Sequence, residues 1–419
     1  MKEICLLNDS FPPEIDGVSN AVVNYAKVLS KRNVPVSVVT PECENSDDSI
    51  FSFPVLRYSS VDLRKQTGYT AGVPFSFKPL YMLKGHNVGL LHSHCPIVSN
   101  LLARSLRESL HVPLVMTYHT KFDIDIQNTL HSKLLQTSSL RALVRNINTS
   151  DEVWTVSKGA GENLKKLGFE GDYIIMENGV DIPKGRLPEE EVLCCTKGYD
   201  LPREVPVFLF VGRLMWYKGI RLILDTLTAL RSRGTDFRMV FAGSGNDEND
   251  IKQYARTVNL EDRCIFTGPI RDRKELTAWY CRADLFLFPS TFDTSGLVVK
   301  EAAACSLASV LIKGSCAAEG TKDRHNAFWI EENAASLSRC LEDLLADRQR
   351  MRSAGEAAAE ELYLSWEDAV GIAVDRYGVV MDNYAAGKYK KHHRPADQLF
   401  RAESALDKIL TEVKNRFGK

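Results

Sequence analysis

Long hydrophobic runs are missing from this sequence. No apolar stretch in its 419 residues approaches the roughly 20 that a membrane-spanning helix needs. The first apolar run ends at Asp9, which is too early for a secretion signal. We therefore expect this run to be the first strand of a cytoplasmic protein.

An excess of charge of one sign is also missing, and cysteine motifs are scarce. The formal net charge is -1, so there is no overall basic field that would favour nucleic acid as a partner. The ten cysteines form no C-x-x-C pair, and Cys5, Cys264 and Cys281 lie inside apolar runs. We expect reduced, buried thiols and no metal site.

Short apolar runs alternate with longer amphipathic segments through the first half of the chain. Continuous apolar strands between helices are typical of a parallel sheet that is covered on both faces. Strands are expected at Glu3–Asp9, Val34–Thr40, Val88–His94 and Pro113–His119 and in EVWTVS and YIIMENG, with helices at about Gly17–Arg32, Ile97–Leu110 and Leu130–Ile147.

The same pattern restarts after a polar stretch over 181–206. PVFLFVG, FRMVFAG, CIFTG, LFLFPS and SVLIKG are the expected strands of a second sheet. The fold class is therefore α/β, with two Rossmann-like, doubly wound domains followed by C-terminal helices. We place the domains at 1–185 and 200–364, a helix at 365–385, and a basic segment with a final helix at 386–419.

Candidate site residues in the first half follow the expected strands, where open α/β sheets bind ligands. Gly17 opens a helix after the first strand, and its backbone can meet an anion or a sugar. His119 ends a strand, where an imidazole can donate to a substrate hydroxyl or phosphate. For His92 and His94 we prefer a structural role.

The second half carries cations and glycines at equivalent places. Arg213 follows a strand, and Lys218 stands at the start of the next helix, an arrangement that suits a diphosphate. A surface pair that caps a loop is the alternative. Gly243 and Gly245 also follow a strand and let a ligand approach the backbone, although this G-x-G by itself says little.

The segment LFLFPSTFDTSGLVVKEAAAC is the most informative one. Asp293 lies in the loop after a buried strand, and Ser295, Gly296, Leu297 and Val298 open a helix whose free N–H groups can bind a phosphate. Glu301, one turn inside this helix, can accept hydrogen bonds from a ribose diol. Alternatively, Glu301 is simply an acidic residue favoured near a helix start.

These pieces together resemble the family-4 retaining glycosyltransferases of the GT-B fold, in which the two domains face each other across a cleft. The resemblance runs from about Met1 to Tyr384. The matching stretches, in order, are DSFPPEIDGVSNAV, HSHCP, TYHT, ENGVD, VGRLMWYKG, FAGSGND, FTGPI and PSTFDTSGLVVKEA. Asp293 and Glu301 occupy the acidic positions of the family's E-x7-E motif, and Asp293 is one methylene shorter than the usual glutamate.

The resemblance implies a role for each candidate. Arg213 and Lys218 would bind the donor diphosphate, and Glu301 would bind the ribose. Asp293 and the N–H groups of 295–298 would hold the transferred sugar and the phosphates, with Gly17 beneath the diphosphate and His119 facing the sugar. The expected reaction is metal-independent, retaining transfer of a hexose or N-acetylhexosamine, with no permanently bound cofactor. A UDP-sugar is favoured as donor, and a GDP-sugar is the alternative.

The acceptor stays open between a membrane lipid and a cell-surface glycan. The segment Leu130–Ile147 carries Lys133, Arg141 and Arg145 beside leucines, which is typical of a helix that lies on a membrane surface. A packed helix with a solvated basic side explains the same pattern. Peripheral contact with the inner face of the membrane is thus one expectation. A degenerate nucleotide-sugar-binding subunit and a GT-B sugar-nucleotide epimerase remain as alternative functions.

Overall fold

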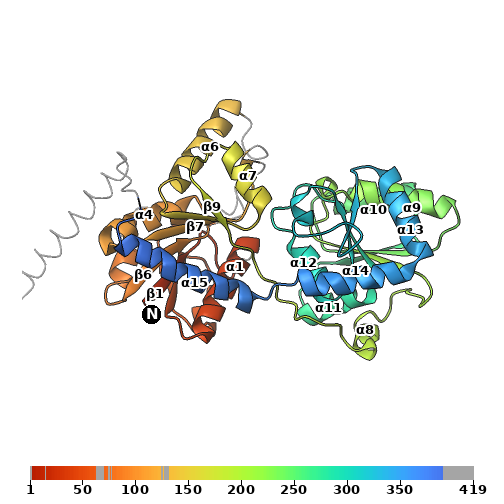
Figure 1. Cartoon of the computed structure of the whole chain (residues 1–419), viewed down its shortest axis with the longest axis horizontal. Helices are drawn as coiled ribbons and strands as arrows, with labels where there is room; N and C mark the ends of the chain where they lie inside the picture. Colours follow the sequence, from red (N-terminus) through yellow and green to blue (C-terminus); the bar gives the residue numbers. More distant parts are fainter. Residues whose placement is uncertain are drawn as a thin grey trace, which may run out of the picture. The chain divides into compact units, whose positions relative to one another are not determined.

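The chain forms two compact units in a computed structural model, which describes residues 2–14, 16–62, 70–73, 76, 78–123, 126 and 132–389 (Figure 1). Unit 1 consists of Met1–Glu177 together with the segment from Trp366 onward, and unit 2 is Asn178–Ser365. The final helix expected after residue 390 lies outside the described residues. No helix in the described part of the chain is long and apolar enough to cross a membrane.

Unit 1 is built on a seven-stranded parallel sheet with the strand order β3-β2-β1-β6-β7-β8-β9. Its central strands β1, β6 and β7 are fully buried, as expected for a sheet covered by helices on both faces. Its elements are β1 (Glu3–Leu7), α1 (Gly17–Lys31), β2 (Val36–Pro41), η1 (Asp48–Ile50), β3 (Val55–Tyr58), β4 (Ser60–Asp62), β5 (Thr70–Gly72), α3 (Lys78–Met82), β6 (Val88–Ser93), α4 (Val98–Leu110), β7 (Leu114–Tyr118), α6 (Lys133–Ile147), β8 (Glu152–Thr155), α7 (Lys158–Lys166), β9 (Tyr173–Ile175) and α15 (Trp366–Ala385).

The C-terminal helix α15 belongs to unit 1, although it follows unit 2 in the sequence. It packs along α1, as Figure 1 shows, and Trp366 meets the ring of Tyr25 edge-on at 6.0 Å. Farther along α15, the fully buried Tyr377 stacks on Trp154 of β8 and reaches His92 of β6. These aromatic contacts fix α15 on the sheet because large buried rings contribute much of the packing energy.

Unit 2 is built on a six-stranded parallel sheet with the strand order β12-β11-β10-β13-β14-β15. Its core is a continuous apolar cluster drawn from both faces of this sheet. Its elements are α8 (Glu189–Cys195), β10 (Val207–Val211), η2 (Trp216–Lys218), α9 (Ile220–Ser232), β11 (Arg238–Ala242), α10 (Glu248–Thr257), β12 (Cys264–Gly268), α11 (Arg273–Arg282), β13 (Leu285–Phe288), α12 (Leu297–Ala304), β14 (Ser309–Ile312), η3 (Cys316–Ala318), β15 (Phe328–Ile330), α13 (Ala334–Ala346) and α14 (Arg348–Glu361).

The predicted α/β class with two doubly wound, parallel sheets is confirmed. The structure contains elements that the sequence did not predict, among them β4, β5 and α3 between β3 and β6. The polar stretch over 181–206 contains helix α8, which packs on α11 through the buried Val192. Strands β3 and β15 were not predicted because each is short and stands at the edge of its sheet, where the apolar signal is weak.

Candidate active site

The topological switch point of unit 2 lies between β10 and β13, the neighbouring strands from which the sheet grows in opposite directions. Arg213 follows β10, and Asp293 follows β13. Lys218, at the end of η2, donates from Nζ to Oδ1 of Asp293 at 2.6 Å. The two loops at the switch point thus bring together a buried lysine and a carboxylate that the sequence had placed 75 residues apart.

Lys218 is buried between aromatic rings, whereas Arg213 is exposed. The Lys218 ammonium lies 5.8 Å from the ring centres of both Tyr217 and Phe288, which favours the cation. The next residue, Gly219, packs closely against the loop after β13, since a Cβ on it would come within 2.1 Å of the Pro289 carbonyl oxygen. The guanidinium of Arg213 makes no hydrogen bond or ion pair with any residue that the structure describes, and the residue is exposed.

Helix α12 begins at this switch point without a cap. Gly296 adopts φ +57, and no side chain accepts a hydrogen bond from the first turn. A Cβ on Gly296 would lie 2.9 Å from the Ala317 Cα, so only glycine fits here without displacement. The open N–H groups of 295–298 therefore combine with Lys218 and Arg213 to form a site of positive potential that suits a diphosphate.

Glu301, one turn into α12, is held by two residues of α11. Tyr280 donates its hydroxyl to Oε2 at 2.9 Å, and Arg273 approaches Oε1 at 3.5 Å. Arg273 also donates to Asp181 at 3.0 Å. Burial raises the pKa of Glu301, while Arg273 and Tyr280 oppose the rise. Tyr280 and Arg273 thus hold the Glu301 carboxylate in place, and its ribose-binding role stays a prediction.

The packing of the fold itself requires glycine at the two positions after β11, Gly243 and Gly245. A Cβ on Gly243 would lie 2.0 Å from the Gly212 carbonyl oxygen, and one on Gly245 would lie 2.3 Å from that of Leu214. The loops after β10 and β11 are therefore packed backbone to backbone. This packing explains both glycines without a ligand, and their donor-binding role stays a prediction.

Gly17 stands at the corresponding switch point of unit 1, between β1 and β6. It is the first residue of α1, after Asp16, which accepts from the N–H groups of Val18 and Ser19 in a capping box. A Cβ on Gly17 would meet nothing within 4 Å. The backbone of this turn is therefore open to a close approach.

His119 follows β7 and is 8% exposed. Its Nε2 lies 3.0 Å from Nδ1 of His94, whose ring lies against that of His92 at 4.0 Å. Burial lowers the pKa of His119 to about 3 and holds those of His92 and His94 well below the ordinary value. All three rings are neutral, so His119 can act as a hydrogen-bond donor but not as a cation. His92 bridges Thr117 and Tyr377, in line with a structural role.

Three functional candidates were missed from the sequence. Tyr280 and Arg273 hold Glu301 but stand in a segment that reads as an ordinary amphipathic helix. Asp9 follows β1 and accepts from the N–H groups of Val98 and Ser99, so it caps α4. A polar residue directly after the first strand was the available signal for Asp9.

Chemically, the switch point of unit 2 combines cations and free N–H groups with two carboxylates. Such an arrangement can bind a diphosphate beside groups that accept from hydroxyls. Within the described residues, no cluster of three or more His, Cys, Asp or Glu side chains is arranged to hold a metal ion.

Two family models match this chain. Residues 15–184 match the family model Glycosyltransferase Family 4, and residues 197–361 match Glycosyl transferases group 1. The alpha-monoglucosyldiacylglycerol synthase of Streptococcus pneumoniae is 23% identical over 72% of this chain and 69% of its own length. A GDP-mannose-dependent alpha-mannosyltransferase of Corynebacterium glutamicum is 23% identical over 73% of this chain and 71% of its own.

Solved structures show the same fold. Sucrose-phosphate synthase from Thermosynechococcus elongatus matches with a TM-score of 0.74 at 18% identity, covering 91% of this chain and 100% of that one. HepE from Anabaena in complex with UDP matches with a TM-score of 0.72 at 18% identity, covering 90% and 100%. The fold is therefore GT-B.

Proposed function

Since the chain belongs to the family-4 glycosyltransferases, we propose that it transfers a hexose or N-acetylhexosamine from a nucleoside-diphosphate sugar, with retention of the anomeric configuration. The observation that carries this proposal is the switch point of unit 2. There Lys218 and Arg213 lie at the uncapped start of α12, and Glu301 stands one turn inside that helix. A diphosphate with an attached ribose matches this set of donors and acceptors.

In the proposed reaction the acceptor hydroxyl attacks the anomeric carbon from the face that the diphosphate leaves. The new bond joins the acceptor oxygen to that carbon, and the bond from the carbon to the phosphate oxygen breaks. The hydroxyl proton passes to the departing phosphate. Lys218 and Arg213 stabilise the negative charge that grows on the leaving group, which makes a metal ion unnecessary.

Asp293 has two roles in this scheme. Its Oδ1 takes one of the three N–H donors of Lys218 and so positions the ammonium. The carboxylate also accepts from hydroxyls of the transferred sugar, while neutral His119 donates to the same sugar. Because Asp293 is shorter than glutamate, we expect a donor preference different from that of relatives with glutamate at this position.

The nucleotide is the first thing to measure. We favour a UDP-sugar because HepE of the same fold is solved with UDP and with UDP-glucose. A GDP-sugar is the alternative, in line with the mannosyltransferase relatives. In calorimetry without added metal, the protein should bind one of UDP, GDP and ADP selectively. The sugar conjugates of that nucleotide are then tested for binding in the same way. If none of them binds, the proposal is wrong. Binding without turnover on any acceptor would favour a degenerate binding subunit, and a changed sugar without acceptor would favour an epimerase.

Glu301→Gln tests the ribose contact. The amide keeps the size but loses the charge-assisted hydrogen bonds, so donor binding should weaken by roughly 1–3 kcal/mol. Glu356→Gln, on an exposed part of α14, is the control and should leave binding unchanged. Wild-type donor affinity and turnover in Glu301→Gln would remove Glu301 from the site.

For the acceptor we propose a membrane lipid, reached by peripheral contact with the inner face of the membrane. Helix α6 exposes Leu134 to 77% and Leu135 to 56%, beside the exposed cations Lys133, Arg141 and Arg145. Apolar side chains flanked by lysine and arginine favour binding at an anionic bilayer surface. The name of the pneumococcal relative, a diacylglycerol glucoside synthase, points the same way.

Vesicle binding separates this acceptor from a cell-surface glycan. Wild-type protein should sediment with anionic vesicles at low salt, and Leu134→Ser/Leu135→Ser should lose most of this binding. Leu193→Ser, an exposed leucine of α8, is the matched control. No vesicle binding by the wild type would leave the glycan as acceptor.

A further inference from the structure

A cavity of about 290 Å³ lies in unit 2 between the edge strand β15, helix α13 and the start of α14. Phe328 and Leu344 are buried and form its apolar floor. Three arginines line it, each from a different element: Arg324 from the turn before β15, Arg339 from α13 and Arg350 from α14. Nothing in the proposed transfer reaction uses these residues.

None of the residues that line the cavity is one of the proposed donor-site residues. Arg213 and Asp293 follow their strands and stand at the carboxyl edge of the sheet, whereas Arg324 precedes its strand. Because β10, β13, β14 and β15 pair in parallel, residues before and after these strands lie at opposite edges. Arg324 therefore stands at the edge of the sheet opposite Arg213 and Asp293.

The charge in the cavity is positive and only partly neutralised. Three arginines face two aspartates, Asp323 and Asp343. Asp323 is already engaged, since it accepts from the backbone N–H of Trp329 at 2.9 Å and lies 3.9 Å from Nε of Arg324. The guanidinium groups of Arg339 and Arg350 make no hydrogen bond or ion pair with any described residue.

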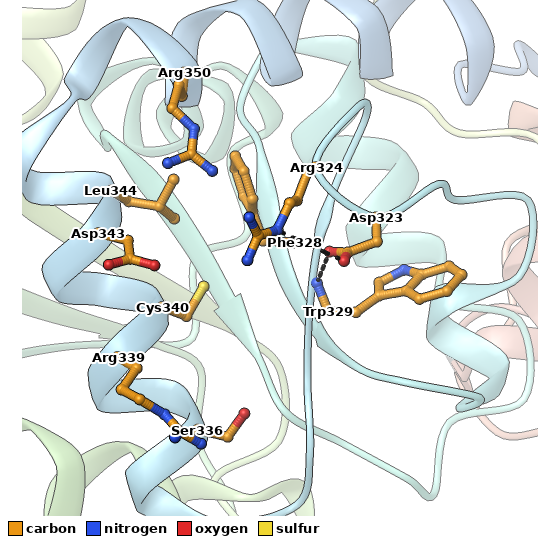
Figure 2. A pocket seen from close by; sticks show the side chains of 10 residues that line it. All are labelled: Asp323, Arg324, Phe328, Trp329, Ser336, Arg339, Cys340, Asp343, Leu344 and Arg350. Carbon is orange, nitrogen blue, oxygen red and sulfur yellow. Dashed lines mark hydrogen bonds and ion pairs between the residues drawn. The ribbon is translucent and has the colours of Figure 1, made fainter.

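Two of the guanidinium groups converge. Figure 2 shows Arg324 and Arg350 extended toward the space above the Cys340 thiol, with Arg339 at the rim near Ser336. Burial raises the pKa of Cys340 to about 12, and the two aspartates add to this rise while Arg324 and Arg350 oppose it. Cys340 is therefore a neutral thiol, and the chemistry of this pocket is that of the arginines.

The backbone at Arg324 is held in an uncommon conformation. Its φ is +60, in the left-handed region that side chains rarely adopt. The turn is fixed by the N–H of Arg324, which donates to the Ala327 carbonyl at 2.7 Å, and by the N–H of Lys322, which donates to the Asn326 side chain at 2.6 Å. Such conformations cluster at ligand sites, because the surrounding structure must enforce them.

From these observations we propose that the cavity binds a phosphate group, either as free phosphate or as the phosphomonoester of a small molecule. Each guanidinium offers two parallel N–H donors, and a phosphate dianion has three acceptor oxygens for them. The apolar floor of Phe328 and Leu344 leaves room for a small organic part. Such a site would let a phosphate-bearing molecule act on the donor unit from the edge opposite the donor.

Calorimetry with inorganic phosphate and with glucose 6-phosphate tests this site, at constant ionic strength with chloride as the compensating anion. Both Arg350→Gln and Arg324→Gln should weaken binding about tenfold or more, as expected for one lost bidentate pair. Arg352→Gln on the same helix α14, which does not line the cavity, is the matched control. Circular dichroism checks that each variant is folded, and Arg339→Gln replaces any that is not.

The outcomes are distinct. Tighter binding of glucose 6-phosphate would support an organic phosphomonoester, and tighter binding of inorganic phosphate would support the free ion. The proposal is overturned if neither ligand gives saturable binding, or if Arg352→Gln weakens binding as much as Arg350→Gln. It is also overturned if Arg213→Gln, and not Arg350→Gln, abolishes binding, because phosphate would then occupy the donor site.

Discussion

Helices α4 and α1 begin at the switch point of unit 1 with capped N-termini, whereas α12 begins at that of unit 2 without a cap. Asp9 accepts from the first turn of α4, and Asp16 accepts from the first turn of α1. Gly296 offers no side chain to α12. The first N–H groups of α12 therefore have no side-chain partner at the N-cap and can bind a group from outside the chain.

The side chains near the two switch points also differ in charge. Unit 1 buries three neutral histidines beside β6 and β7, while the site of unit 2 carries a lysine, an arginine and two carboxylates. Neutral His119 suits hydroxyl recognition, and the charged set suits a diphosphate. The comparison predicts that changes in unit 2 act mainly on catalysis and that pH acts mainly on the stability of unit 1.

The largest effect is expected for Lys218→Met. The variant keeps the apolar stem but removes the cation that stabilises the leaving diphosphate, so turnover should fall about 100- to 1000-fold. Lys252→Met, which breaks a partly exposed pair with Glu248 on α10, is the control and should keep nearly full turnover. Initial rates with the donor identified by calorimetry measure both. If Lys218→Met stays within about tenfold of wild type, the charged site is not where transfer occurs.

The next effect concerns pH. The unfolded chain protonates its histidines near the ordinary pKa of about 6.5, whereas His92, His94 and His119 stay neutral in the fold. At a pH between the folded-state and unfolded-state pKa values of these histidines, the unfolded state binds more protons than the folded state. The free energy of unfolding therefore falls as the pH falls. From pH 6.5 to 5.5, the three residues should cost unit 1 about 3 kcal/mol.

Hydrogen exchange of peptides from β6 and β10, corrected for the intrinsic rate at each pH, reads the two units separately. Protection of β6 should fall on acidification, and that of β10 should not. In unit 2 the raised pKa of Glu301 acts in the opposite direction, because there the folded state binds more protons. If protection changed equally with pH for β6 and β10, the assignment of three neutral imidazoles would be contradicted.

Much of the fold could be predicted from the sequence because buried parallel strands are continuous apolar runs. The strands that precede Arg213, Asp293 and His119 were placed correctly to within a few residues. The Lys218–Asp293 pair and the Tyr280–Glu301 contact could not be predicted, since both depend on which strands and helices become neighbours. Helix α8 was missed because a short helix with one buried apolar residue gives no periodic signal.

A smaller effect is expected for Gly296→Ala. Alanine in the left-handed region costs about 1 kcal/mol, and its Cβ would also press on Ala317. Gly314→Ala, with φ +77 and open space around the Cβ, has only the conformational cost. Chemical unfolding should therefore show a larger loss for Gly296→Ala, and turnover should fall in this variant alone. Equal losses of turnover would mean that the start of α12 has no special role.

The smallest effect is expected for Gly17→Ala, and it separates a glycine kept for a ligand from one kept for the fold. The added Cβ would meet no atom of the protein within 4 Å, and φ at Gly17 is ordinary, so the variant should unfold at the same or slightly higher denaturant. Gly378→Ala on α15 has equally open space and is the matched control. If a diphosphate approaches the backbone of Gly17, donor affinity should fall by about tenfold or less in Gly17→Ala and stay constant in Gly378→Ala. Unchanged donor affinity in Gly17→Ala would restrict diphosphate binding to unit 2, where the uncapped start of α12 and Lys218 would then have to supply all of it.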